Sequence, residues 1–327
     1  MADAVAVDTW DAQGVTLSDI TGALSDLRHR SAGAAAGART AVMTLIAVAA
    51  GDDQAYSATQ ALRMLGQHHP ARIVLLRPEP DGVATLDARA VLYATEPNGS
   101  PITFEEVTLI VGGQAAHHLD SVAEAFTLSD LPIVVWYVND VPDPTDPLLS
   151  VASAVLLDSR DAADTGRMRS LLELARRRTV VDLSWIRLRP WRALLAGLFD
   201  PPPCHPWLGA VDSVEVRGKI GPRQLLGGWL VAQLGLLPDQ VTLVDSRHVE
   251  IRMTCRQGDR EAIFDVGRGD AVRVVAARAE LPDGFTRTQA AQLADDPLPT
   301  ALAEGLTHLD PDTVWEKALS AATLLGS

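Results

Sequence analysis

The chain has 327 residues, of which 47% are apolar and 21% charged, so it is long enough for two domains and has the composition of a folded globular protein. Acidic residues outnumber basic residues by 42 to 28, which gives a formal net charge of −14. This balance argues against general nucleic-acid binding and against docking on anionic lipid, because both need a cationic surface.

The sequence also lacks the features of a membrane or secreted protein. Its first eight residues contain two acids and no base, and no long apolar run follows them. The most apolar stretch, residues 41–50, is about half as long as a membrane-spanning helix needs to be. Two cysteines, Cys204 and Cys255, are too few for a disulfide framework or a cysteine-rich zinc site. We therefore expect a soluble cytoplasmic protein.

The first two hundred residues alternate between strand and helix patterns. A helix is expected at 15–30, where leucine and isoleucine recur with helical spacing, followed by a glycine-rich connection at 31–37. The clearest buried strand is LPIVVWYV at 131–138. This alternation predicts an α/β domain with a mainly parallel three-layer sheet, which has an antiparallel edge at 86–111. The other elements are expected as strand 40–48, helix 52–66, strand 72–76, strands 86–95 and 104–111 around a hairpin at 97–101, helix 115–127, strand 155–158, helix 165–178, strand 179–182 and helix 185–199.

The strongest break in the chain is the triple proline at 201–203. We place a domain boundary there, between an α/β domain at 1–200 and a smaller α+β domain at 204–327. Successive strand patterns beyond the break favour an antiparallel sheet followed by C-terminal helices. The expected elements are strand 211–217, helix 222–235, strands 241–244, 248–256, 261–266 and 271–277, and an acidic helical tail from 281 that ends in an amphipathic segment at 311–325.

No catalytic or cofactor motif is recognisable in the sequence. Gly112 and Gly113 lie between a strand and a helix, as in a phosphate-binding loop, but the third glycine is missing and a tight turn explains the pair. The histidine pairs at 68–69 and 117–118 are adjacent residues, which point in different directions on a helix or strand and make no two-ligand clamp. A Walker A lysine, a Gly-x-Ser-x-Gly elbow and a His-x-x-x-His pair are all absent. We therefore expect neither a metal, nor a cofactor, nor catalytic residues.

A cluster of tryptophan and arginine lies at 182–192, with the sequence DLSWIRLRPWR. We expect Ser184 to cap the following helix and Asp182 to orient an arginine. The helical spacing of Trp191 and the leucines at 194, 195 and 198 is typical of a core face, so the tryptophans can be core residues and the arginines partners of nearby carboxylates. Tryptophan and arginine are also enriched at interface hot spots. Contact with a protein or an anionic ligand therefore remains the second interpretation.

Residues 182–202, DLSWIRLRPWRALLAGLFDPP, resemble the signature of the glucose-6-phosphate dehydrogenase assembly protein family, OpcA. Two other segments are similar to the same family in the same order, HPARIVLL at 69–76 and DLPIVVWYVNDVPDPTDPL at 130–148. The resemblance covers residues 40–280. It implies a non-catalytic protein that assists the assembly and allosteric activation of glucose-6-phosphate dehydrogenase, the first enzyme of the oxidative pentose phosphate pathway.

The resemblance makes the dehydrogenase the expected partner of this chain. The candidate contact residues are Trp185, Arg187, Arg189, Arg192 and Arg72. The alternative is an enzyme or sensor that binds a sugar phosphate or nucleotide at the carboxyl ends of the α/β strands, where such sheets place their ligands. Its candidates are the two glycines at 112–113 and the arginines that follow strand 179–182.

Overall fold

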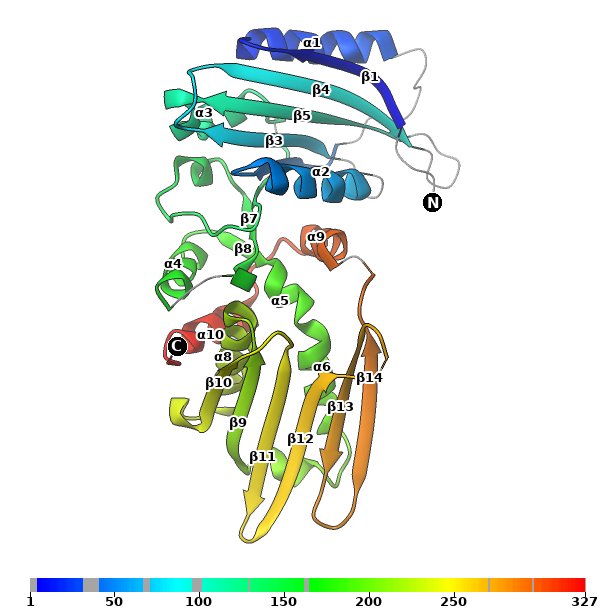
Figure 1. Cartoon of the computed structure of the whole chain (residues 1–327), viewed down its shortest axis with the longest axis vertical. Coiled ribbons are helices and arrows are strands. Elements are labelled where there is room, and N and C mark those ends of the chain that lie inside the picture. The colour runs from blue at the N-terminus through cyan, green and yellow to red at the C-terminus, as the bar shows by residue number, and fades with distance from the viewer. Residues whose placement is uncertain are drawn as a thin grey trace. The chain divides into compact units, whose positions relative to one another are not determined.

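A computed structural model describes the chain over residues 5–31, 41–66, 71–95, 102–128, 130–161, 165–269, 271–295 and 297–326 (Figure 1). Its contacts divide the chain into two compact units of nearly equal length. Unit 1 consists of residues 1–157, 178–181 and 306–309, and unit 2 consists of residues 158–177, 182–305 and 310–327.

Unit 1 is built on an eight-stranded sheet with the order β1-β4-β5-β3-β2-β6-β7-β8. The pairs β5–β3, β3–β2, β2–β6 and β6–β7 are parallel, whereas β1–β4 and β4–β5 are antiparallel. This confirms the expected mainly parallel sheet with an antiparallel edge. The strands are β1 Val5–Ala12, β2 Thr44–Val48, β3 Arg72–Glu79, β4 Leu86–Thr95, β5 Ile102–Gly112, β6 Ile133–Tyr137, β7 Ala154–Leu157 and β8 Thr179–Asp182.

The helices of unit 1 lie on both faces of its sheet. Helix α1 packs along β1 and β4, as Figure 1 shows. The β2-α2-β3 and β5-α3-β6 connections run in opposite directions along the sheet, so the right-handed crossover rule puts α2 and α3 on opposite faces. With both faces covered, the central strand β2 is apolar after Thr44 and buried in all but its last residue. The helices are α1 Leu17–Ser31, α2 Asp52–Gly66, η2 Gly113–His117, α3 Leu119–Glu124 and η3 Pro147–Ser150.

Two parts of unit 1 differ from the sequence-based expectation. Strand β1 was not expected, because Val5 and Val7 remain exposed and its pairing with β4 across some eighty residues leaves no local pattern. The single helix expected at 115–127 is interrupted at His118, which separates η2 from α3. The glycine-rich connection and the hairpin at 97–101 lie outside the described residues.

Unit 2 contains a six-stranded sheet with the order β10-β9-β11-β12-β13-β14. Every pair in it is antiparallel except β10–β9, so the expected antiparallel sheet is confirmed with one parallel edge pair. Its strands are β9 Val211–Gly218, β10 Val241–Asp245, β11 Glu250–Gln257, β12 Arg260–Arg268, β13 Val274–Glu280 and β14 Thr286–Gln292. The helices are η4 Ser159–Asp161, α4 Thr165–Ala175, α5 Leu183–Arg187, α6 Arg189–Leu198, α7 His205–Leu208, α8 Ile220–Leu234, η5 Pro238–Gln240, α9 Pro297–Thr307 and α10 Thr313–Ala322.

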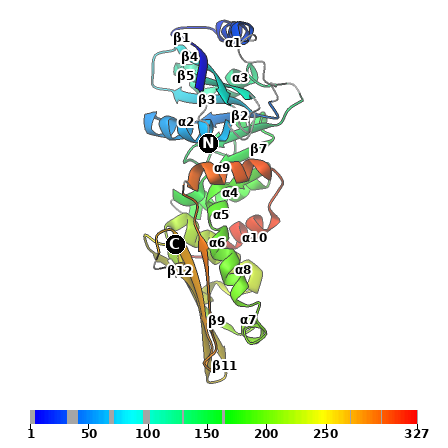
Figure 2. The same cartoon turned by 90° about the vertical axis from the view of Figure 1, so that its right-hand side faces the viewer.

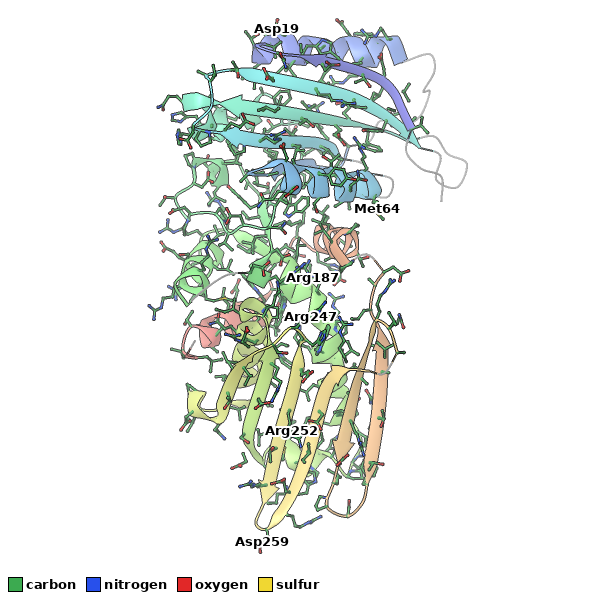
Figure 3. All side chains as sticks on the ribbon, viewed as in Figure 1. Asp19, Met64, Arg187, Arg247, Arg252 and Asp259 are labelled. Atoms are coloured by element: carbon green, nitrogen blue, oxygen red, sulfur yellow. The ribbon has the colours of Figure 1, made fainter. Side chains whose placement is uncertain are left out.

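One face of this sheet carries the core of unit 2. Helix α6 packs on β12, β13 and β14, and α8 packs on β9 and β10. Figure 2 shows the sheet nearly edge-on, with α6, α7 and α8 on the same side. The opposite face presents polar and charged side chains, such as Arg252 in Figure 3. The alternation of buried and exposed residues along β11 and β12 is therefore the pattern of a sheet covered on one face.

Strand β14 corrects the expectation of a wholly helical tail. Residues 286–292 pair antiparallel with β13. Their sequence, TRTQAAQ, has no β-branched apolar residue and its residues are exposed or only half-buried. Residues 286–292 therefore form a strand because they pair with β13, and no local sequence pattern predicts that pairing. The final amphipathic segment is confirmed as α10.

The triple proline at 201–203 lies inside unit 2. Helix α6 precedes it and the sheet that α6 covers follows it. Phe199 stacks on Phe264 across this point, with ring centroids 4.2 Å apart. A domain boundary at 201–203 stays a prediction.

Candidate functional site

The tryptophan–arginine cluster begins where β8 ends and α5 starts. Asp182 is the N-cap of α5, because its Oδ1 accepts a hydrogen bond from Ser184 N at 3.0 Å. The helix expected at 185–199 is divided at Leu188, before Pro190 in the first turn of α6. Asp182 therefore takes the capping role that we expected of Ser184.

Asp182 is fully enclosed by hydrogen-bond donors. Its carboxylate also accepts from Ser159 N at 3.1 Å, Ser159 Oγ at 2.6 Å and Trp315 Nε1 at 3.2 Å. Burial raises the pKa of Asp182, while these donors favour the ionised form. No arginine is among its hydrogen-bond partners in the described residues, so the expectation that Asp182 orients one is wrong. The acceptor positions of the Asp182 carboxylate are instead occupied by neutral donors from η4, α5 and α10.

Trp185 forms a second tryptophan–aspartate pair. Its Nε1 donates to Asp312 Oδ2 at 2.8 Å, and Asp312 also caps α10 through Val314 N and Trp315 N. Trp185 is only 3% exposed. The two pairs, Trp185 with Asp312 and Trp315 with Asp182, therefore tie α5 to the start of α10 from both sides.

Arg192 lies over this pair from the next helix. Its guanidinium carbon is 3.3 Å from the centroid of the Trp185 ring, and its Nη2 donates to Trp185 O at 3.0 Å. Burial lowers the pKa of Arg192 to about 10. The contacts of Arg192 and Trp185 are thus interior packing contacts.

Arg187 and Arg189 lie on the same segment but differ in partner and in exposure. Arg187 pairs with Asp158, and their side chains are only 16% and 4% exposed. Arg189 pairs with Glu304, and its side chain is 59% exposed. Among the candidate arginines, Arg189 therefore has the most exposed side chain.

Arg72 belongs to unit 1, whereas the other four candidates belong to unit 2. Its Nε lies 3.3 Å from Glu105 Oε2, and its Nη1 donates to Phe126 O at 3.1 Å. Burial lowers the pKa of Arg72. The structure thus gives Arg72 a local partner and brings the other four together on α5 and α6.

The sequence cluster did not indicate the residues that complete the site. Asp158, Ser159, Asp312 and Trp315 reach it from η4, its preceding residue and the start of α10. They lie 23 to 133 residues from their partners along the chain. The one local signal was the helix start at Asp312, because an aspartate before an amphipathic segment is typical of an N-cap.

The glycine pair named for the alternative function has a structural explanation. Gly113 has a φ of +62°, in the left-handed region that favours glycine. A Cβ on Gly112 would lie 2.0 Å from Val83 O, so only glycine allows the end of β5 to approach the loop before β4 this closely. The segments that follow the parallel strands β2 and β6 carry Asp52 and Asp140, which do not favour an anionic ligand there.

The cysteines and metal ligands can also be placed. Cys204 and Cys255 are fully buried free thiols, and burial raises the pKa of both, that of Cys255 to about 12. The described parts of the chain contain no group of three or more His, Cys, Asp or Glu side chains able to hold a metal ion. Histidines 68 and 69 lie outside those parts. None of the described helices is long and apolar enough to cross a membrane.

Comparison with known proteins identifies relatives over most of the chain. One family sequence model, described as the N-terminal domain of a glucose-6-phosphate dehydrogenase subunit, matches residues 63–176. A second, described as the C-terminal domain of the same subunit, matches residues 178–319. The second match contains the whole tryptophan–arginine cluster.

Two curated relatives carry the name "Putative OxPP cycle protein OpcA". The protein from Synechocystis sp. is 29% identical over 185 residues, which are 52% of this chain and 38% of the relative. The protein from Synechococcus elongatus is 28% identical over 189 residues, which are 54% of this chain and 42% of the relative. The matches therefore span less than half the length of either relative.

A solved structure of an oxidoreductase from Sinorhizobium meliloti is similar over 86% of this chain and 95% of its own, with 10% identity and a TM-score of 0.37. A likeness this low carries no argument about fold or activity.

Proposed function

Because this chain belongs to the OpcA family of glucose-6-phosphate dehydrogenase assembly proteins, we propose that it is a non-catalytic factor that assists assembly of that dehydrogenase and raises its activity. The observation that carries the proposal is the pair of consecutive family matches at 63–176 and 178–319. The proposed setting is the cytoplasm, in the oxidative pentose phosphate pathway.

The physical basis of such activation is differential binding. A bound protein shifts an enzyme between two states only by as much as its affinity for the two states differs. A factor that prefers the active oligomer therefore raises the active fraction without supplying a catalytic group. A preference of about 1.4 kcal/mol shifts the equilibrium about tenfold.

Within this proposal, the α5–α6 segment is the contact surface in unit 2. Arg189 is our proposed contact residue, since its side chain is exposed and its guanidinium can leave Glu304 to bind a carboxylate of the dehydrogenase. Trp185, Arg187 and Arg192 act by holding this segment in place through their interior contacts. Arg72 belongs to a separate candidate contact in unit 1.

The decisive experiment adds the purified chain to the glucose-6-phosphate dehydrogenase of the same organism. We expect a complex in analytical ultracentrifugation and an initial rate that rises with concentration of the added chain until it saturates. A complex with unchanged kinetics would show a scaffold instead of an activator. Stabilisation by glucose 6-phosphate or NADP without co-purification of the dehydrogenase would favour the ligand-binding alternative.

The contact surface is tested with a matched pair of arginine variants. Arg189 and Arg177 are both exposed and ion-paired, with side chains 59% and 53% exposed. We expect Arg189→Ala to weaken binding of the dehydrogenase at least about fivefold, as truncation of an interface hot spot does, and Arg177→Ala to leave it unchanged. Equal binding by both variants would remove Arg189 from the interface.

A further inference from the structure

Unit 2 contains a pocket that borders the proposed contact surface and shares Arg187 and Arg189 with it. It has a volume of about 390 Å³, which is within the range of small-molecule sites. Its wall is formed by the α5–α6 segment, the turn between β12 and β13, and the chain from β14 into α9. Elements from three parts of the sequence therefore converge on one concave site.

Four arginines line this pocket: Arg187, Arg189, Arg268 and Arg273. Arg268 forms no ion pair within the described part of the chain. The buried Nη1 of Arg187 has no hydrogen-bond partner there either, although Nη2 binds Asp158. The exposed guanidinium of Arg268 is thus available to a ligand, and the enclosed Nη1 of Arg187 lies near the pocket wall without a partner, which is costly for a buried donor.

Among the described residues, the acids paired with these arginines are Asp158 with Arg187, Glu304 with Arg189 and Asp295 with Arg273. Asp295 is 93% exposed, so its pairing with Arg273 is screened by water and contributes little. An anion that enters the pocket can therefore replace Asp295 at small cost.

The backbone of Arg273 is held in an uncommon conformation. Its φ is +56°, in the left-handed region that is unfavourable for residues other than glycine. The carbonyl of Arg273 accepts from Leu293 N at 2.8 Å, so the residue that follows β14 holds this turn at the pocket wall. Strain of this kind is concentrated at binding sites, where it places a side chain for a ligand.

The rest of the wall is apolar. Pro190, Trp191, Leu293 and Ala301 contribute carbon surface beside the guanidiniums. Trp191 is locked in place because its Nε1 donates to Val249 O at 3.0 Å. The geometry points to a site for a small phosphorylated metabolite, with the phosphate on Arg268 and Arg273, the charge of Arg187 nearby, and the organic body against Trp191. A phosphate monoester supplies three strong acceptor oxygens, which suits several guanidiniums better than a single carboxylate does.

Isothermal titration calorimetry of the full chain at low salt tests this site. The dehydrogenase is not present in this experiment, so a negative result would reject the pocket as a ligand site without rejecting the proposed function. The probes are glucose 6-phosphate against glucose, adenosine monophosphate against adenosine, and inorganic phosphate. We expect at least one monoester to bind at least about tenfold more tightly than its unphosphorylated counterpart, because the counterpart has no phosphate to accept charged hydrogen bonds from the arginines. Inorganic phosphate should bind more weakly than that monoester.

Variants locate the binding. We expect Arg268→Ala and Arg273→Ala each to weaken binding of the monoester about tenfold. Arg256→Ala is the control, since Arg256 is exposed and ion-paired near the opposite end of the β11–β12 hairpin. Circular dichroism spectra of all three variants should match that of the unmodified chain.

Three results would overturn the inference. They are no binding of any phosphorylated probe at millimolar concentration, equal binding of phosphorylated and unphosphorylated probes, and binding that Arg268→Ala and Arg273→Ala leave unchanged. Loss of dehydrogenase binding in both variants without binding of any probe would identify the pocket as a protein-docking site and equally reject a metabolite site.

Discussion

The buried carboxylate of Asp182 shows how single residues hold unit 2 together. Four donors from three separate parts of the chain converge on it: Ser159 N, Ser159 Oγ, Ser184 N and Trp315 Nε1. A carboxylate offers about four acceptor positions, so Asp182 satisfies all of these buried groups at once. Its removal would leave several donors without partners.

Asp182→Asn keeps the shape of the side chain but replaces one acceptor oxygen with a donor. We expect it to lower the free energy of unfolding by about 1–3 kcal/mol at pH 4, because an NH₂ group cannot accept from Trp315 Nε1. Burial raises the pKa of Asp182 above 3.8, so the folded state binds the proton more tightly than the unfolded state. The stability difference between wild type and variant should therefore narrow as the pH rises through the folded pKa.

Urea denaturation of both proteins from pH 4 to neutrality measures this difference. Asp259→Asn, at the exposed tip of the β11–β12 hairpin in Figure 3, is the control and should match wild type at every pH. A difference that widens with rising pH would contradict a raised pKa.

Arg187 supports the same region through a buried ion pair. We expect Arg187→Ala to destabilise the protein by about 3–5 kcal/mol, since it leaves the buried carboxylate of Asp158 without its main partner. Arg177→Ala breaks an exposed pair with Glu173 and should change stability by less than about 1 kcal/mol. Thermal denaturation compares the two, and equal melting temperatures would show that the Arg187 pair is not structural.

At the scale of elements, α8 and α10 pack by direct contact of their backbones. A Cβ on Gly228 would lie 2.1 Å from Ala318 O, and one on Gly221 would lie 1.8 Å from Ser159 O. Both glycines therefore serve close packing within unit 2, although glycine is unfavourable inside a helix. Their benefit comes from contacts that the helix sequence alone does not reveal.

Gly228→Ala should separate α8 from α10 and lower the free energy of unfolding by about 1–3 kcal/mol, as overpacking does. Gly22→Ala, in helix α1, is the matched control, because nothing lies within 4 Å of the new Cβ. It should stabilise α1 by about 0.5–1 kcal/mol. Urea denaturation gives both values, and effects of the same sign would contradict the close approach of α8 and α10.

At the scale of the whole molecule, the chain passes between the two units more than once. Residues 158–177 belong to unit 2 and residues 178–181 to unit 1, and the chain then returns at 182. Helix α6 and the sheet that it covers lie on opposite sides of the triple proline. Cutting the chain at that proline would therefore separate a core helix from its sheet.

Expressed fragments test where the chain divides. We expect residues 204–327 to be unfolded, because the inner face of β12, β13 and β14 loses Trp191, Leu194, Leu195 and Leu198 of α6. Residues 158–327, which contain all of unit 2, should retain helix and strand signals in circular dichroism. A dispersed NMR spectrum from 204–327 would instead support the predicted boundary at 201–203.

The sequence by itself determined the α/β alternation, the position of most strands and the core face of α6, and the resemblance of three segments indicated the family. The structural features depend on residues close together in the chain, where hydrophobic spacing and turn residues act directly. Strands β4 and β8 and helix α2 have the predicted bounds for this reason.

Tertiary structure alone decided strand β14, the edge strand β1 and the surroundings of the tryptophan–arginine cluster. Residues 286–292 form a strand because β13 offers a partner, and Asp182 meets Trp315 although 133 residues separate them. The cluster left open whether Trp185 and Arg192 are core or contact residues; the structure buries Trp185 and stacks the half-buried Arg192 on its ring. The free energy of such contacts arises only when distant segments exclude water from one another, so no local pattern contains it.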